Sequence, residues 1–266
     1  MKKFFASICA ATILLFTPIA DAEIQTYEGN GEYLMSDFEA MPVAKERAKN
    51  RAEEDALDQA GVYVTSFSKS TDAKLTADEI TAVTNTITEI VGDVDYSEKL
   101  FQLTEQSTAT VVAAKLTAKV DTDGIANFLK LNEKDRVKIV EDSNRLKKAA
   151  DTNDKNVEDL KRRYDKTDSQ TERDEIKTQI NSLDREFLAI QKLREANKFM
   201  FKGDYRAALD FCNQAIELNP TATAYNNRAN AYNLILRHQD ALNDINRAIE
   251  MEPNTCTLYV TREKLF

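Results

Sequence analysis

An internal repeat in the C-terminal part of the chain constrains its fold more than any other feature. Residues 205–220 and 238–253 align with a shift of 33 positions, and seven of the sixteen pairs are identical. Small residues recur where two helices would cross closely, and a proline recurs where the second helix of each unit would end. Such units bury a continuous core only against one another, so we expect a helical array. The positions expected to hold the array together are Gly203, Tyr205, Ala208, Ala215, Pro220, Tyr225, Ala241, Ala248 and Pro253.

These residues, with Gly203-Asp204-Tyr205 at the expected turn and Tyr225-Asn226-Asn227-Arg228 opening the next helix, resemble tetratricopeptide repeats. The resemblance covers residues 189–255. Leu258-Tyr259 begins the first helix of a third repeat, which would cap the stack. The period is one residue shorter than the usual one, because the loop after Pro220 is one residue short. The resemblance implies an all-α domain over residues 188–266 that binds a protein or peptide in a groove lined by the first helices.

Three asparagines are the candidate partner-binding residues of that groove: Asn197, Asn227 and Asn230. In chaperone-binding members of the family, a clamp of lysines and asparagines holds a C-terminal carboxylate, and Asn197 and Asn227 match the clamp asparagines. The clamp's three cationic positions are here Leu193, Thr257 and Thr261. The resemblance therefore argues against that ligand. An amide-rich groove that pairs with a peptide backbone remains, with ordinary solvent-facing polar residues as the alternative.

The chain has no glycine and no proline between Gly124 and Gly203, which predicts helix throughout this stretch. Apolar residues recur there at spacings of three and four, and residues 165–175, which contain no aliphatic side chain, interrupt them. We expect a helical spacer over residues 125–187, either a hairpin within one chain or a coiled coil with a second chain. The expected seam comprises Leu146, Ala149 or Ala150, Val157, Leu160, Tyr164, Ile176, Ile180, Leu183, Phe187 and Ile190.

Residues 23–124 combine strand and helix patterns, which predicts a small α+β domain. We expect a strand over Ile24–Met35, a helix over Leu75–Ile90, and an antiparallel pair of strands over Val94–Thr104 and Ala109–Val120. Between the first strand and that helix, a further helix is expected to end at Gly61. Alanines every four residues would let it lie close to a sheet: Ala44, Ala48, Ala52, Ala56 and Ala60.

This α+β part resembles the N-terminal domain of flagellar assembly protein T and related secreted or lipoprotein domains of bacterial envelopes. The resemblance depends on Glu28-Gly29-Asn30-Gly31, Gln59-Ala60-Gly61, Gly92-Asp93-Val94 and Val111–Asp121, and it rests on pattern rather than on a signature motif. It implies an assembly or interaction module of the cell envelope, with no catalytic residues to transfer.

The first 22 residues have the three parts of a secretory signal peptide. Lys2 and Lys3 form the basic start, Ile8–Phe16 the apolar run, and Ala20-Asp21-Ala22 a small-residue cleavage site. The alternative, an uncleaved anchor, needs a longer apolar stretch than this one. We therefore expect export to the periplasm or the outside of the cell, with no membrane insertion after cleavage.

Composition gives little support for catalysis, cofactors or nucleic-acid binding. The net charge of −9 opposes binding to phosphate backbones, and a single histidine, His238, leaves few parts for acid–base chemistry. Asp121-Thr122-Asp123-Gly124 resembles part of a calcium loop, but Lys119 and Lys130 occupy its end positions, so a helix N-cap is favoured. We expect no metal and no cofactor. Cys212 and Cys256 are either a disulfide or two separately buried thiols.

These patterns predict an exported, non-enzymatic protein–protein interaction scaffold with an α+β domain, a helical spacer and a repeat stack that holds a protein partner. The alternative is an oligomeric structural or assembly protein of the bacterial cell envelope that uses the spacer as its interface.

Overall fold

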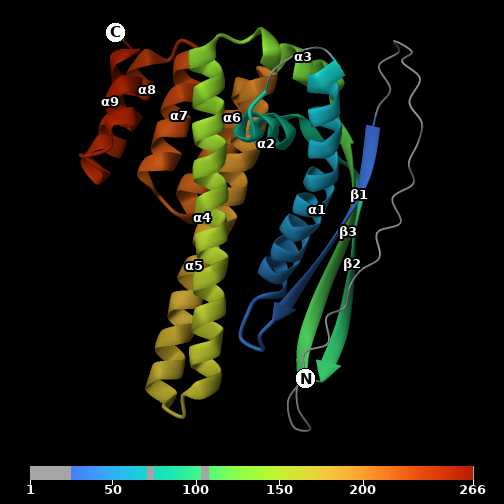
Figure 1. Cartoon of the computed structure of the whole chain (residues 1–266). Coiled ribbons are helices and arrows are strands. Elements are labelled where there is room, and N and C mark those ends of the chain that lie inside the picture. The colour runs from blue at the N-terminus through green and yellow to red at the C-terminus, as the bar shows by residue number, and fades with distance from the viewer. Residues whose placement is uncertain (1–24, 71–74, 103–107, 266) are drawn as a thin grey trace.

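The computed structural model of the chain describes residues 25–70, 75–102 and 108–265. The expected signal peptide lies outside these residues. Within them, a three-stranded sheet is followed by a mostly helical C-terminal half, in the order β1-α1-α2-β2-β3 and then α3 to α9. Figure 1 shows three layers side by side: the sheet, the long helix α1, and a helical hairpin that continues into the repeat helices. No helix of the described part is long and apolar enough to span a membrane.

The sheet is antiparallel, with β3 (Thr108–Val120) between β1 (Gln25–Met35) and β2 (Thr88–Gln102). Its register pairs Gly31 with Ala114 and Thr88 with Val120. The second strand begins earlier than predicted, because Thr88 and the residues after it pair with β3 instead of extending the preceding helix. A register shift follows Val91, at the strand entry expected around Gly92.

Helix α1 (Met41–Ser70) packs its alanine stripe directly on β1, as the four-residue spacing predicts. A Cβ atom added to Gly31 would lie 2.3 Å from the backbone oxygen of Ala48, so only glycine permits this approach. The expected end of the helix at Gly61 is wrong. The helix continues to Ser70 because Val64, in the next turn, is buried in a second core with α2 and α3.

Two short helices, α2 (Ala77–Ile87) and α3 (Thr122–Lys130), close one end of the sheet. The Thr76 side chain and Glu79 form a capping box at the start of α2. Asp121 caps α3 by accepting a hydrogen bond from the backbone N–H of Asp123 at 3.1 Å. The Asp121–Gly124 segment is therefore a helix start, as the sequence favours.

Helices α4 (Glu133–Lys166) and α5 (Gln170–Lys202) form an antiparallel hairpin. Its seam is buried within one chain, and the Asn153 side-chain amide donates to the Leu183 carbonyl at 2.8 Å across it. A spacer separate from the parts on either side is not confirmed. Helix α5 runs unbroken through position 188, where the sequence analysis placed a boundary, and ends only at Gly203.

The C-terminal helices stack in pairs, consistent with the repeat pattern. They are α6 (Tyr205–Leu218), α7 (Ala222–Leu234), α8 (His238–Met251) and α9 (Cys256–Glu263). The C-terminal half of α5 pairs with α6, and α7 pairs with α8. The predicted crossing alanines are fully buried: Ala208, Ala215, Ala241 and Ala248. Cys212 and Cys256 are both free thiols, so the disulfide alternative is wrong. The alternative of two buried thiols holds for Cys212 and is wrong for Cys256, which is exposed.

Candidate functional site

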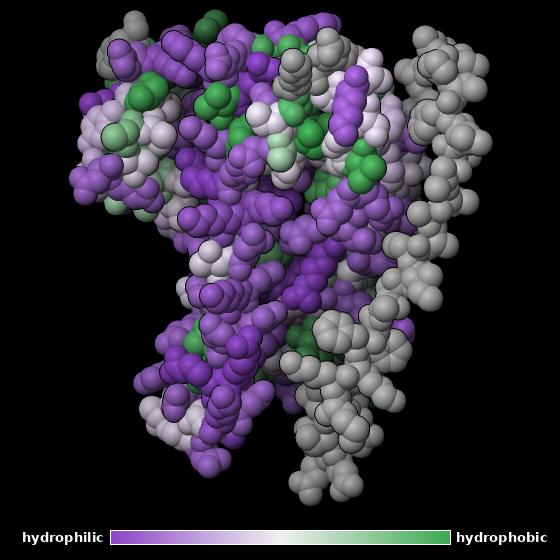
Figure 2. Space-filling model, viewed as in Figure 1, coloured by the Kyte–Doolittle hydropathy of each residue, from purple (hydrophilic) through white to green (hydrophobic). Residues whose placement is uncertain are grey.

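A pocket of about 410 Å³ lies on the inner side of the repeat stack, where the first helices α5 and α7 face α4 and α2. Its floor is apolar and is made by Ile139, Leu146, Met200 and Phe201. Its volume falls in the range of small-molecule sites in proteins. The face of the molecule seen in Figure 2 is largely hydrophilic, with apolar residues gathered toward the end that carries α2, α3 and the repeats.

Two of the three predicted asparagines, Asn197 and Asn230, line this pocket. The third, Asn227, is 0% exposed, and its side-chain amide donates to the Asn197 side-chain oxygen at 3.2 Å. Asn197 and Asn227 thus form a pair across neighbouring first helices. A role of the three residues in partner binding stays a prediction.

Helix α4 contributes one wall of the pocket, through the hairpin contact with α5 that the apolar spacing predicts. Leu146 and Ala150 of α4 share a buried cluster with Ile190 and Leu193 of α5, so α4 covers the inner side of the first repeat. Farther along the pocket, Lys138 Nζ donates to Asn230 Oδ1 at 2.9 Å. The sequence did not predict the contact between Lys138 and Asn230. Helix α4 carries charges of both signs, so any of its faces could have been exposed to solvent.

The polar groups around the pocket have an excess of unpaired positive charge. Among the described residues, no carboxylate forms an ion pair with Lys138, Lys147 or Arg194, all of which line it. The two carboxylates of the lining are already engaged: Asp142 with Arg145 at 2.6 Å, and Asp135 with the Asn132 amide at 2.8 Å.

Burial shifts the pKa values of two ionisable side chains that line the pocket. It lowers the pKa of the Lys138 ammonium group, an effect that the nearby Asp142 only partly offsets and the cation Lys264 reinforces. It also raises the pKa of Asp142, against the influence of Arg145 and Lys138. The burial that causes both shifts also strengthens charge–charge interactions in the pocket, because fewer water molecules screen them.

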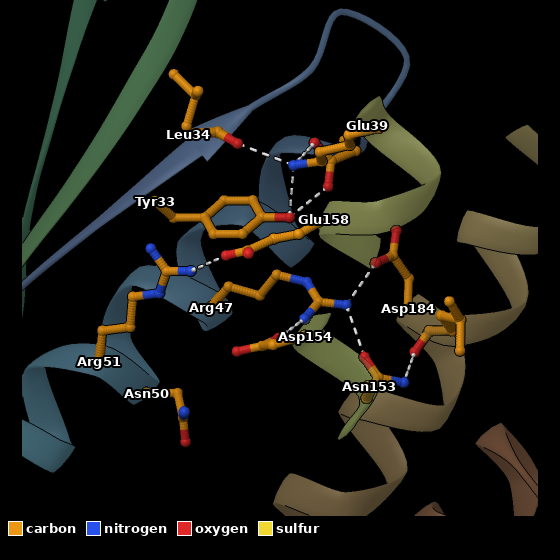
Figure 3. Close-up of polar contacts among 12 residues, drawn as sticks. Tyr33, Leu34, Glu39, Arg47, Asn50, Arg51, Asn153, Asp154, Glu158 and Asp184 are labelled. Carbon is orange, nitrogen blue, oxygen red and sulfur yellow. Dashed lines mark hydrogen bonds and ion pairs between the residues drawn. The ribbon is translucent and has the colours of Figure 1, made fainter. Parts of the chain in front are cut away.

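A second polar cluster, drawn in Figure 3, joins the α+β part to the hairpin. Arg47 of α1 is 1% exposed, and its guanidinium donates to Asp184 at 2.9 Å and to Asn153 at 3.1 Å and also pairs with Asp154. Its guanidinium carbon also lies 4.3 Å from the centre of the Phe187 ring. One cation of α1 thereby fixes both arms of the hairpin.

The same cluster extends to the end of β1. Tyr33 Oη donates to a Glu39 carboxylate oxygen at 2.5 Å, and Lys161 of α4 pairs with Glu39 at 2.6 Å. Burial, reinforced by the Glu39 charge, raises the pKa of Tyr33 far above its usual value. The side chains of this polar cluster bond to one another. We therefore assign the cluster to docking of the α+β part against the hairpin rather than to catalysis.

The remaining reactive groups lie apart. His238 is exposed, and its Nδ1 lies 3.0 Å from Asn233 Oδ1. Within the described ranges, no group of three His, Cys, Asp or Glu side chains is arranged to hold a metal ion.

Comparison with known proteins supports the repeat part. A tetratricopeptide-repeat family model matches residues 199–221. Similar proteins include Sperm-associated antigen 1 of Rattus norvegicus, which is 34% identical over 83 residues (31% of this chain, 9% of that protein). Small glutamine-rich tetratricopeptide repeat-containing protein 2 of Mycosarcoma maydis is 41% identical over 66 residues (24% and 19%). The co-chaperone DNJ1 of Cryptococcus neoformans, with tetratricopeptide repeats and a J domain, is 36% identical over 78 residues (29% and 15%).

The matched segments span less than a fifth of each of these relatives, and all three organisms are eukaryotes. Residues 199–221 thus match a tetratricopeptide repeat, the helical stack around them is consistent with further repeats, and the relatives suggest a role in protein–protein interaction. The bacterial origin and the resemblance of residues 23–124 to flagellar assembly protein T remain predictions.

Proposed function

We propose that this chain is an exported, non-enzymatic scaffold that binds a protein partner on the inner side of its repeat stack. The observation that carries the proposal is the inner side of the stack beyond the wall made by α4, where α7 carries Asn230 and Leu234 at the edge of a hollow and is followed by α9. Side-chain amides both donate and accept, so they suit the backbone of a bound segment.

Exposed apolar residues extend this surface toward α9. Leu234 lies at the edge of the hollow and is half exposed, and Val260, one repeat after Asn227, is 51% exposed. Helix α4 covers the inner side of the first repeat, so partner contact falls on α7 and α9. Apolar residues with a polar rim are typical of such interfaces.

The alternative function, oligomeric assembly through the helical spacer, needs an apolar seam available to a second chain. The hairpin already buries its seam residues, among them Val157, Ile176 and Ile180, within one chain. The arrangement therefore favours the scaffold. Sedimentation of residues 23–266 tests this, since we expect a monomer at all concentrations and a concentration-dependent oligomer would restore the alternative.

Export rests on residues 1–22 and is tested separately. N-terminal sequencing of the secreted protein should start near Glu23. A secreted form that still begins with Met1, or a chain retained inside the cell, contradicts this part of the proposal.

Partner binding is tested by capture with the immobilised mature chain, residues 23–266, from an extract of the producing cells. Val260→Asp places a charge on the proposed surface, and Val62→Asp is the matched control because Val62 is a 68% exposed valine on the remote helix α1. We expect Val260→Asp to lose the captured protein and Val62→Asp to retain it. Equal capture by both variants would move the partner surface away from α9.

A further inference from the structure

The pocket between α4, α5 and α7 is more enclosed than a peptide groove needs to be. Helix α4 is held on both sides of it: Ile139 packs against the core around Phe128, and Leu146 packs against α5. The wall toward α2 is closed by a hydrogen bond from the Asn85 amide to Ser143 Oγ at 3.2 Å. These contacts close the pocket on the sides of α2 and α5, so it suits a small molecule better than a long extended chain.

The lining also specifies the chemistry of that occupant. The floor is aliphatic and aromatic, which favours an apolar body. Lys138, Lys147 and Arg194 stand around this floor without a carboxylate partner among the described residues, while Asp142 and Asp135 are engaged by Arg145 and Asn132. The Asn132 amide is neutral and leaves the charge of Asp135 in place, so three lining cations without an ion pair stand against one such carboxylate, although the whole chain carries −9.

We propose that this pocket binds a small amphipathic carboxylic acid, of the fatty-acid type, with its chain on the apolar floor and its carboxylate at Lys138. The ammonium group of Lys138 has a single hydrogen bond, to Asn230, among the contacts of the described residues, and an ammonium group can donate three. A carboxylate would complete its coordination in a partly water-excluded site, where such charge-assisted bonds are strongest. The site goes beyond the proposed partner binding, which uses α7 and α9.

The test uses decanoate as the probe and the mature chain in isothermal titration calorimetry. We expect saturable binding of one decanoate per chain, weakened by added salt because the head group interaction is ionic. Decanol, which has the same chain without charge, should bind more weakly, and decylamine should not bind.

Lys138→Met keeps the apolar stem of the side chain and removes its charge. We expect it to weaken decanoate binding by about tenfold or more and to leave decanol binding unchanged. Lys155→Met is the matched control, since Lys155 is an exposed lysine of the same helix without an ion pair among the described residues. Circular dichroism and thermal unfolding establish that each variant is folded.

A second variant separates the charge of Lys138 from its hydrogen bond. Asn230→Ala removes the acceptor but keeps the cation, so decanoate affinity should hold or rise while a merely structural role of Lys138 would make both variants equally weak. The proposal is overturned if the folded wild-type chain shows no saturable decanoate binding, if decanol binds as tightly as decanoate, or if Lys138→Met binds like wild type. Protein capture by the Val260 variants is read independently, so the two proposals fail separately.

Discussion

Leu236 occupies, one repeat later, the backbone position that Gly203 occupies at the end of α5. The φ angle is 80° at Gly203 and 62° at Leu236, which is the left-handed region that side chains other than glycine rarely adopt. Leu236 is also 76% exposed, so its side chain gains little from burial. The second repeat therefore holds a strained residue at the turn that leads into α8.

Leu236→Gly should stabilise the chain by about 0.5–1 kcal/mol, because relief of the left-handed strain exceeds the extra entropy of glycine in the unfolded chain. Gly203→Ala should destabilise it by about 1 kcal/mol for the same reason. Urea unfolding followed by circular dichroism measures both. A loss of stability in Leu236→Gly would show that the exposed side chain contributes contacts that outweigh the strain.

Two glycines of the α+β part should respond oppositely to alanine. Gly31→Ala puts a methyl group 2.3 Å from the Ala48 backbone oxygen, so β1 and α1 must separate, at about 2 kcal/mol or more. Gly61→Ala meets nothing within 4 Å inside α1 and should stabilise the helix by about 0.5–1 kcal/mol. Thermal unfolding of the two variants tests the pair, and similar shifts in both would contradict the close contact.

Arg47→Ala should be among the most damaging single changes. It leaves Asp184 buried without a cation, which costs about 3–5 kcal/mol. Arg162→Ala is the control, since Arg162 pairs, among the described residues, only with exposed carboxylates of its own helix, and its loss should cost less than about 1 kcal/mol. Chemical denaturation compares them, and equal costs would mean that the hairpin docks without help from Arg47.

The two thiols that the structure describes, Cys212 and Cys256, should differ in reactivity. Burial raises the pKa of Cys212 to about 12, so its thiol stays protonated and inaccessible at neutral pH. A thiol reagent should therefore label Cys256 in the native chain and Cys212 only after unfolding. Rapid labelling of both thiols without denaturant would contradict the burial of Cys212.

The same shift links stability to pH in the alkaline range. The unfolded thiol ionises from its ordinary value of 9.0 upward while the folded one stays neutral to about 12, so the free energy of unfolding falls as pH rises between these values. Cys212→Ala should lose less stability over this range than wild type. Parallel curves for the two proteins would assign the alkaline loss to other groups.

The sequence predicted features whose cause is local. The crossing alanines follow from the repeat, and the α1 stripe follows from alanines every four residues. The end of α1 was missed because Val64 gains burial from a core that only α2 and α3 complete. Lys138 in the pocket and Arg47 in the docking cluster were also missed, since each meets partners far away in the chain.

Because α5 is continuous, the repeats cannot be separated from the hairpin as an independent domain. One end of this helix belongs to the hairpin that Arg47 clamps to α1, and the other end is the first wall of the repeat stack. A cut at position 188 would remove Ile180 and Phe187 from the shared helix and strip α4 from the inner side of the first repeat. Fusions and truncations of this protein should therefore be made beyond the two ends of residues 25–265, not between its halves.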